Sequence, residues 1–174
     1  MLQAGDLAPA FRVQPVFGLP VQTSGRPLVV LFLRSLSGGL ARAAVAQAQR
    51  ALPTLDAAGV GMVAFTRCDL TMARDYVPRE HVLFPIVVEP DGARFEAWGV
   101  GRDKGFVRSL TGLRPATVRT AFASLGLARA RPEGGVDQLP AEFLVGADGH
   151  LRYAHYGRTI FDLPDVEALC AALP

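Results

Sequence analysis

Cysteine is the residue type in this sequence best able to carry nucleophilic or redox chemistry, and the chain has two, Cys68 and Cys170. Cys68 follows an apolar run and stands beside Arg67, and a thiol at a strand end beside a cation can react as a thiolate. Two interpretations stay open for Cys68: a displaced reactive thiol, or a partly buried small residue in a strand-to-helix turn. We favour the second, because an arginine adjacent in sequence need not touch the sulfur. Cys170 lies in an apolar stripe and is expected to be a small buried hydrophobe.

The spacing of the histidines and cysteines gives little support for a metal site or a disulfide. His81, His150 and His155 are dispersed, and neither a Cys-x-x-Cys nor a His-x-x-x-His pair occurs. Structural metal sites require such ligand pairs, and two distant cysteines do not form a disulfide framework. We therefore predict no metal and no cofactor.

Any functional group would be positioned by the stretch from Leu28 to Arg50. Its first part, Leu28 to Leu33, has the length and β-branched content of a buried strand. A polar turn follows, and then an Ala- and Gln-rich helix over 41–58. A strand, a tight turn and a helix N-terminus together can present a reactive group or an anion site. The turn consists of Arg34, Ser35, Leu36, Ser37, Gly38 and Gly39.

The same turn can be interpreted in two ways. Gly38 and Gly39 could expose backbone N–H groups to an anion, with Arg34 and Arg42 nearby. The simpler alternative is a tight turn that requires glycine.

These residues resemble the peroxiredoxin-like branch of the thioredoxin fold, the alkyl hydroperoxide reductase and thiol-specific antioxidant (AhpC/TSA) family. In that family a strand ending in Phe-x-x-Arg or Tyr-Pro-Lys precedes a helix opened by a catalytic cysteine, within Thr-Pro-Gly-Cys or Trp-Cys-Pro-x-Cys. Phe32 and Arg34 are the corresponding residue types, with one residue between them instead of two. One register places the cysteine position on Leu40, and the other places the two cysteine positions on Gly38 and Ala41. No cysteine occurs between residues 28 and 50, so the resemblance lacks its peroxidatic nucleophile.

The resemblance extends along most of the chain. It includes the order of Gly, Ala-Pro and Phe over 5–11, Phe-Pro followed by Pro-Asp-Gly over 84–92, and a C-terminal hairpin with Asp-Gly at its turn. It implies that Pro140 stands where thioredoxin-fold proteins place a cis-proline beside the active site.

The pattern of apolar runs and turns agrees with that fold. We expect a thioredoxin-like, peroxiredoxin-type α/β fold: a three-layer domain with a central mixed β-sheet, spanning residues 1–174 as a single domain. Pro53 predicts a kink or a break within the first helix, and Gly59 its end. The other expected strands are 11–14, 19–23, 60–66, 84–89, 141–145 and 151–156, and the other expected helices are 70–77 capped by Asp69, 115–124, and one opened by Pro164.

Composition excludes several functional classes. Half of the residues are hydrophobic, 20% are charged and the net charge is +2, which argues against a disordered chain. Basic residues are scattered, so we expect no nucleic-acid partner. No apolar run is long enough to span a bilayer, and the N-terminus does not resemble a signal peptide. A cytoplasmic location is therefore expected.

Two functional hypotheses follow. The first is a degenerate, redox-inactive peroxiredoxin-like protein that binds a protein partner or a small anion at the turn from Ser35 to Arg42, with a homodimer implied by resemblance. The second is a thiol-dependent antioxidant peroxidase that uses Cys68 as its catalytic residue. An exposed Cys68 facing the turn would favour the second, and a buried one the first. The expected binding residues are Arg34, Ser35, Ser37, Gly38, Gly39, Leu40, Arg42 and Pro140.

A Ser-His hydrolase through Ser37 and His155 is a third, weaker alternative. The sequence around Ser37 is not the Gly-x-Ser-x-Gly of a nucleophile elbow.

Overall fold

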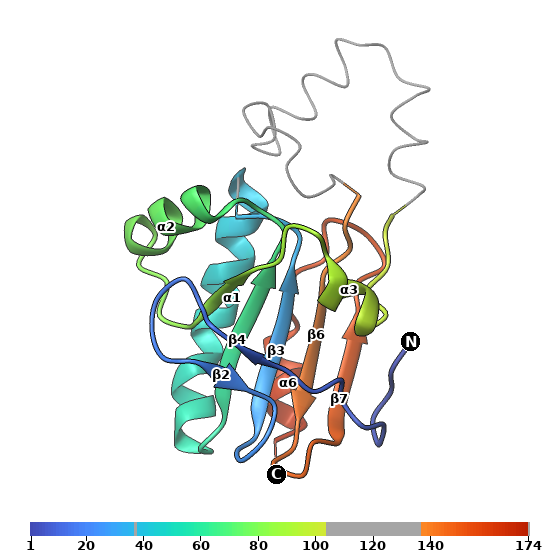
Figure 1. Cartoon of the computed structure of the whole chain (residues 1–174). Coiled ribbons are helices and arrows are strands. Elements are labelled where there is room, and N and C mark those ends of the chain that lie inside the picture. Colours follow the sequence, from blue (N-terminus) through green and yellow to red (C-terminus); the bar gives the residue numbers. More distant parts are fainter. Residues whose placement is uncertain (37, 104–136, 174) are drawn as a thin grey trace.

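A mixed five-stranded sheet forms the centre of the protein, in the order β5-β4-β3-β6-β7 (Figure 1). The computed structural model describes residues 1–36, 38–103 and 137–173. Strands β3, β4 and β5 are parallel, and β6 and β7 complete the sheet in antiparallel pairing. The expected thioredoxin-like α/β fold with a mixed sheet is confirmed. The strands are β3 (Leu28–Leu33), β4 (Gly61–Thr66), β5 (Ile86–Val88), β6 (Ala141–Val145) and β7 (Leu151–Tyr156).

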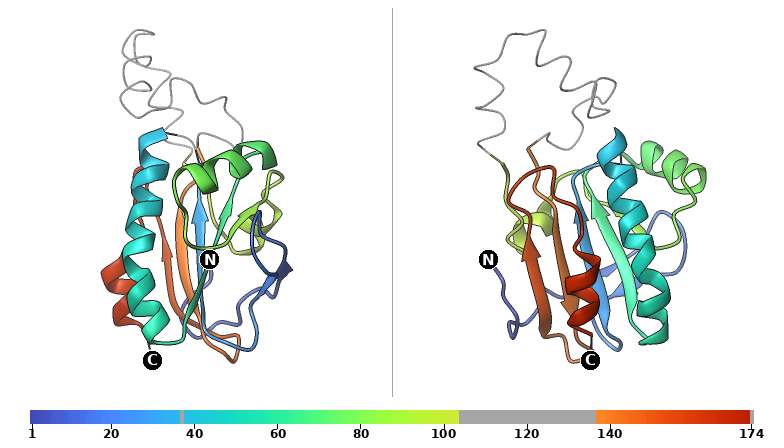
Figure 2. Two further views of the ribbon diagram at one scale, coloured as in Figure 1. Left: turned by 90° about the vertical axis from the view of Figure 1, so that its left-hand side faces the viewer. Right: turned by 180° about the vertical axis from the view of Figure 1, so that it is seen from behind.

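Helices cover both faces of the sheet. Figure 2 shows α1 and α6 on one face, and α3 with the N-terminal strands on the other. Every residue of β3 and β4 is buried, as expected for parallel strands covered on both sides. The helices within the described residues are α1 (Gly38–Ala57), α2 (Leu70–Arg79), α3 (Ala93–Ala97) and α6 (Val166–Ala171).

Helix α1 excludes the break that was one of the two alternatives expected at Pro53; the other alternative, a kink, stays a prediction. The chain continues through Pro53 as one helix of 20 residues and does not break there. Pro53 removes a single N–H, the one that would bond to the Gln49 carbonyl. Ala51 and Leu55 on either side are buried in the sheet-facing core, and this packing stabilises the turn that contains the proline. Gly59 then ends the helix with a φ of +69°, which glycine adopts without a steric penalty.

The two faces of the sheet carry separate cores. The face under α1 packs Val29, Leu31 and Leu33 against aliphatic helix residues. The opposite face is aromatic: Phe32 stacks on Phe65 at a centroid separation of 5.3 Å. Alternate residues of β3 therefore serve opposite cores, as the period of two in a strand requires. The remaining aromatic residues of that second core are Phe11, Phe95, Trp98 and Phe143.

The shorter helices and strands mostly agree with those expected from the sequence. Strands β1 (Arg12–Val13) and β2 (Val21–Gln22) form a separate antiparallel ladder of two residues each, shorter than expected. Asp69 caps α2 by accepting a hydrogen bond from the Met72 N–H at 2.6 Å. The predicted helix over 115–124 lies outside the described residues. None of the helices in the described ranges is long and apolar enough to cross a membrane.

Pro140 differs from the expectation drawn from the resemblance. The peptide bond before it is trans. The backbone on either side is already fixed: the Leu139 N–H donates to the Gly101 carbonyl at 3.2 Å, and the Pro140 carbonyl accepts from the Gly157 N–H at 2.9 Å. These two hydrogen bonds hold the chain at its entry into β6.

Candidate functional site

Strand register brings separate parts of the sequence together at one end of the sheet. Phe32, near the carboxyl end of β3, pairs with Ala141 at the start of β6, and Ala141 pairs with Tyr156 at the end of β7. The N-terminal turns of α1 lie at the same end (Figure 1). A small pocket of about 40 Å³ opens there.

Four of the expected binding residues line the pocket: Arg34, Ser35, Leu40 and Pro140. The remaining lining is largely apolar, and its polar members come from β6, β7 and the loop that follows β7. These other lining residues are Phe32, Leu33, Ala41, Ala44, Ala141, Glu142, His155, Gly157, Ile160, Asp162, Leu163 and Pro164.

Other expected binding residues do not line this pocket. The Arg42 Nε lies 3.3 Å from the Glu80 Oε1, so Arg42 forms an ion pair at the surface. Gly38 and Gly39 open α1, and Gly39 is not among the lining residues. Ser37 lies outside the described residues. The anion site expected at the turn therefore has one of its two arginines engaged elsewhere.

Arg34 is the charged residue at the end of β3. It is 9% exposed, and burial lowers the pKa of its guanidinium. Among the described residues, no hydrogen bond or ion pair joins it to another side chain. A buried guanidinium remains charged in proteins, so Arg34 contributes a positive charge to this end of the sheet.

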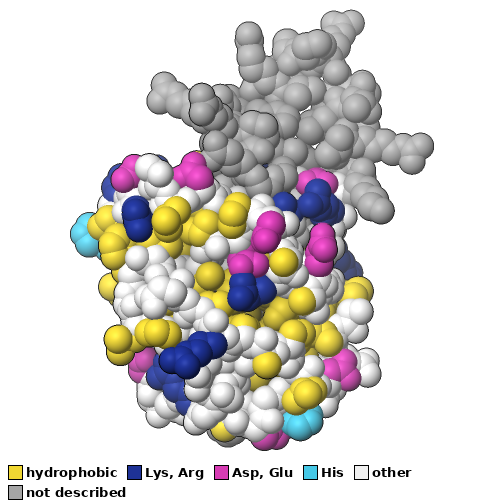
Figure 3. Space-filling model, in the orientation of Figure 1, with side chains coloured by type: hydrophobic (Ala, Val, Ile, Leu, Met, Phe, Trp, Pro, Cys, Tyr) yellow, Lys and Arg dark blue, Asp and Glu magenta, His cyan; other side chains and the backbone are white. Residues whose placement is uncertain are grey.

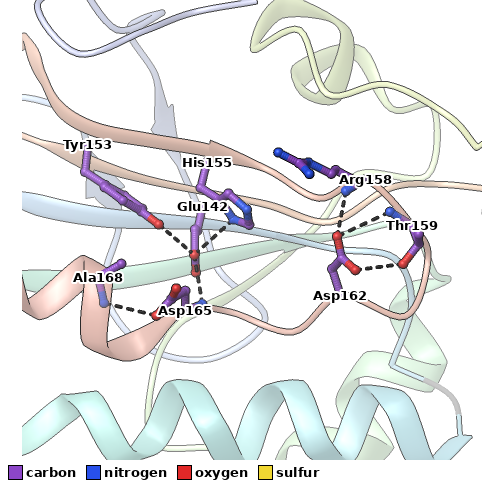
Figure 4. A network of polar contacts seen from close by, with 8 residues as sticks. All are labelled: Glu142, Tyr153, His155, Arg158, Thr159, Asp162, Asp165 and Ala168. Carbon is purple, nitrogen blue, oxygen red and sulfur yellow. Dashed lines mark hydrogen bonds and ion pairs between the residues drawn. The ribbon is translucent and has the colours of Figure 1, made fainter.

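Glu142 is the most deeply buried acidic residue of the pocket, at 1% exposure. Its Oε1 accepts hydrogen bonds from the Asp165 N–H at 2.8 Å and the Tyr153 hydroxyl at 3.3 Å. The His155 Nδ1 lies 3.3 Å from the same oxygen, as Figure 4 shows. Oε2 is buried without a hydrogen-bond partner. Desolvation by burial raises the pKa of Glu142, against the opposing effects of these contacts.

The loop after β7 forms one wall of the pocket. Asp162 holds this loop by accepting hydrogen bonds from the Arg158 N–H at 2.6 Å and the Thr159 hydroxyl at 2.7 Å. Burial acts to raise the pKa of Asp162, but these bonds outweigh it and lower the pKa. At the far end of the loop, Asp165 caps α6 by accepting from the Ala168 N–H at 3.0 Å. The loop is thus anchored at both ends (Figure 4).

Both cysteines lie away from the pocket lining. Cys68 is 2% exposed and belongs to the core on the α1 face of the sheet. Cys170 is half-buried on α6, packed against the same core. The guanidinium of Arg67 donates to the Gln138 Oε1 at 3.2 Å and to the Pro90 carbonyl at 3.3 Å.

Sequence reasoning missed the polar cluster around Glu142, Tyr153 and Asp165, and considered His155 only as a partner for Ser37. A signal was available. Glu142 stands between Ala141 and Phe143 in an apolar run, and an acidic residue in a buried strand requires polar partners. Within the described ranges, no group of three or more His, Cys, Asp or Glu residues could hold a metal ion.

The model of the AhpC/TSA antioxidant enzyme family matches residues 48–159. The chain belongs to this family. The matched stretch of this AhpC/TSA protein begins after the β3–α1 turn, so the match does not bear on the position where a catalytic cysteine would stand. No curated protein sequence matches the chain.

Solved structures support the fold of this AhpC/TSA protein. Peroxidoxin BcpB from Mycobacterium tuberculosis superposes with a TM-score of 0.70 at 12% identity, covering 99% of this chain and 97% of its own. A putative thiol:disulfide interchange protein DsbE from Chlorobium tepidum gives 0.66 at 20% identity, with full coverage of both chains, 100% each. Peroxiredoxin Q from Xanthomonas campestris gives 0.67 at 17% identity, covering 94% and 89%. Identities this low establish the fold alone.

Proposed function

We propose that this AhpC/TSA protein is a binding module rather than a thiol peroxidase, and that it binds its ligand in the pocket beside Arg34 and Glu142. The observation that carries the proposal is the start of α1. The positions where the resemblance places catalytic cysteines hold Gly38, Leu40 and Ala41. None of these side chains can act as a nucleophile.

The burial of Cys68 supports the proposal. A peroxidatic thiol must be reached by peroxide and then by a reductant, and susceptibility to oxidation follows thiolate character and exposure. Cys68 is in the core, where neither peroxide nor a reductant reaches the sulfur. The alternative of a thiol-dependent oxidoreductase using Cys68 therefore requires the core to open.

The size and lining of the pocket support the proposed binding of a small ligand. A volume of about 40 Å³ exceeds the roughly 10–15 Å³ that one water molecule needs by this measure. Its walls combine aliphatic side chains with a few buried polar groups, the composition typical of small-molecule sites. The surface gives less support for a nucleic-acid partner, because Lys and Arg side chains are scattered among acidic and apolar ones on the described face shown in Figure 3. The homodimer and the cytoplasmic location stay predictions.

A peroxide-consumption assay under excess thiol reductant tests the redox half of the proposal. Wild type, Cys68→Ser and the matched control Cys170→Ser are compared. We expect no turnover above background in any of the three. Turnover in the wild type and in Cys170→Ser that disappears in Cys68→Ser would instead establish the oxidoreductase alternative.

A further inference from the structure

The two edges of the central sheet are covered to different extents. At the β5 edge, a strand of three residues, the Val16 N–H donates to the Ile86 carbonyl at 2.8 Å. The other edge is β7, which has six residues. An edge strand of that length offers unpaired N–H and C=O groups to an added strand.

The first residues of the chain already pair with the start of β7. The Gly5 N–H donates to the Leu151 carbonyl, and the Leu151 N–H donates to the Asp6 carbonyl, both at 2.8 Å. This segment runs antiparallel to β7, since Leu7 forms an antiparallel bridge with His150. The backbone at Gly5 has a φ of +95°. Before Gly5, the described residues make no further backbone pairing with β7, so the added strand stops at Leu151.

The next open hydrogen-bonding groups of this edge belong to Ala154 and Tyr156. In the β6–β7 ladder, the Gly157 N–H donates to the Pro140 carbonyl at 2.9 Å. Bonded and non-bonded pairs alternate along an antiparallel ladder. The backbone groups of Gly157 and His155 therefore point toward β6, and those of Tyr156 and Ala154 point away from it. Within the described residues, no hydrogen bond is formed to these outward groups.

A cavity of about 410 Å³ adjoins this open stretch of β7. Ala154, Tyr156 and Arg158 line it on one side, and Gly99 and Gly101 line it from the chain that follows α3. Glycines without side chains leave space for another backbone to approach closely. The end of β7 thus combines open backbone groups with room beside them.

Arg158 contributes a positive charge to this cavity. Its backbone N–H donates to the Asp162 carboxylate at 2.6 Å, while its side chain extends away from that carboxylate (Figure 4). Within the described ranges the Arg158 guanidinium makes no hydrogen bond or ion pair. The described lining residues include His155 but no acidic residue. An acidic group on a ligand would meet a cation here and no competing carboxylate.

We propose that an extended peptide segment of a partner protein adds to β7 at Ala154 and Tyr156, with an acidic side chain beside Arg158. Main-chain hydrogen bonds to a strand edge supply the affinity in this mode of recognition. The peptide runs antiparallel to β7, the direction of residues 5–8 on the same edge. The charge of Arg158 selects the acidic residue. This surface lies beside the ligand pocket of the proposed function, and the inference does not depend on that pocket.

Amide chemical shifts of the full chain test the inference, with the peptide acetyl-Glu-Thr-Val-Thr-Val-amide as the probe. In an antiparallel register that sets the glutamate beside Arg158, the two valines stand opposite Tyr156 and Ala154. We expect shifts of the Ala154 and Tyr156 amides, and slower hydrogen exchange at both. N-methylation of the two valines removes the donors that face β7, and it should abolish these changes.

Substitutions in the protein separate the backbone contribution from the charge. Ala154→Pro removes an outward N–H and keeps the bonds to β6, and edge strands tolerate proline. It should weaken binding about tenfold, whereas Ala154→Val should bind as the wild type does. Arg158→Gln should weaken binding about two- to fivefold. The matched control Arg152→Gln, at a side chain bonded to Asp148, should not. A peptide with glutamine in place of glutamate should bind the wild type and Arg158→Gln equally.

Several results would overturn the inference. One is retained binding of the N-methylated peptide, a result that does not depend on whether Ala154→Pro folds. Another is the absence of binding by the parent peptide, or shifts confined to residues outside β7 and the cavity. Shifts of the Ala154 and Tyr156 amides that grow with protein concentration alone would assign this edge to a second copy of the chain instead. Unchanged binding of the parent peptide to Arg158→Gln would overturn the acidic specificity.

Discussion

Glu142 on β6 and His155 on β7 are directly opposite each other in the antiparallel pair, and the His155 Nδ1 lies 3.3 Å from the Glu142 Oε1. The glutamate is buried and the histidine side chain is 41% exposed. The pair therefore connects the interior of the pocket with solvent. This arrangement sets a carboxyl group whose pKa burial raises beside a histidine that solvent can reach.

Glu142→Gln should stabilise the protein at alkaline pH. Burial raises the pKa of Glu142 in the folded state, so the stability that the group contributes is present below the unfolded pKa and is lost as pH rises through the folded pKa. Glutamine does not titrate. Urea denaturation should show the variant more stable than wild type near about pH 8, by on the order of 1 kcal/mol, with the gain vanishing near about pH 4. A difference that did not change with pH would contradict the assignment.

The aromatic core should depend strongly on Phe32. This ring is fully buried at 0% exposure and stacks on Phe65 at 5.3 Å and edge-on against Phe95 at 4.9 Å. Phe32→Ala should lower the free energy of unfolding by about 3–5 kcal/mol, through lost burial and the cavity left behind. The control Phe17→Ala, at a side chain 52% exposed, should cost less than about 1 kcal/mol. Chemical denaturation of both variants provides the comparison.

Tyr156 ties the N-terminal segment to the sheet. Its hydroxyl donates to the Trp98 carbonyl at 2.7 Å and accepts from the Leu2 N–H at 2.8 Å. Tyr156→Phe should therefore destabilise the protein by about 1–3 kcal/mol, because both partners lose a hydrogen bond. Faster hydrogen exchange at Leu2, measured against unchanged exchange in β3, would locate the effect. Unchanged protection of Leu2 would mean that the contact does not hold the segment.

Asp69 should stabilise α2 through its side chain. The carboxylate accepts from the Met72 N–H at 2.6 Å, so Asp69→Ala should cost about 1 kcal/mol. Asparagine also serves as an N-cap, and Asp69→Asn should retain most of the stability. Thermal denaturation of the two variants decides whether the cap or the charge matters, and equal losses would argue against capping.

Local chemistry explains which parts of the fold the sequence could predict. The apolar run from Leu28 to Leu33 coincides with β3, and the Asp-Gly turn at Asp148 and Gly149 separates β6 from β7. These signals depend on neighbouring residues alone. Of the kink or break expected at Pro53, the break does not occur, because tertiary packing outweighs the loss of one backbone hydrogen bond.

The candidate site was less predictable from the sequence. Its residues come together through the register of the β6–β7 pair and through the loop between β7 and α6. Arg34 after β3, Leu40 on α1 and Pro140 before β6 line the same pocket, since these strand ends and the start of α1 lie at one edge of the sheet (Figure 1). Glu142 acquires its role only when His155 pairs opposite it and the Asp165 N–H reaches its Oε1. Neither relationship is visible along the sequence.

Trapping of cysteine sulfenic acid is the most direct test of the claim that this AhpC/TSA protein has no peroxidatic thiol. The native protein is treated with peroxide in the presence of a sulfenic-acid-specific reagent, and labelling at Cys68 and Cys170 is quantified by mass spectrometry. We predict that the buried Cys68 stays unlabelled in the native state and is labelled once the chain is unfolded, since oxidation follows exposure and thiolate character. Rapid stoichiometric labelling of Cys68 in the folded protein would contradict the account.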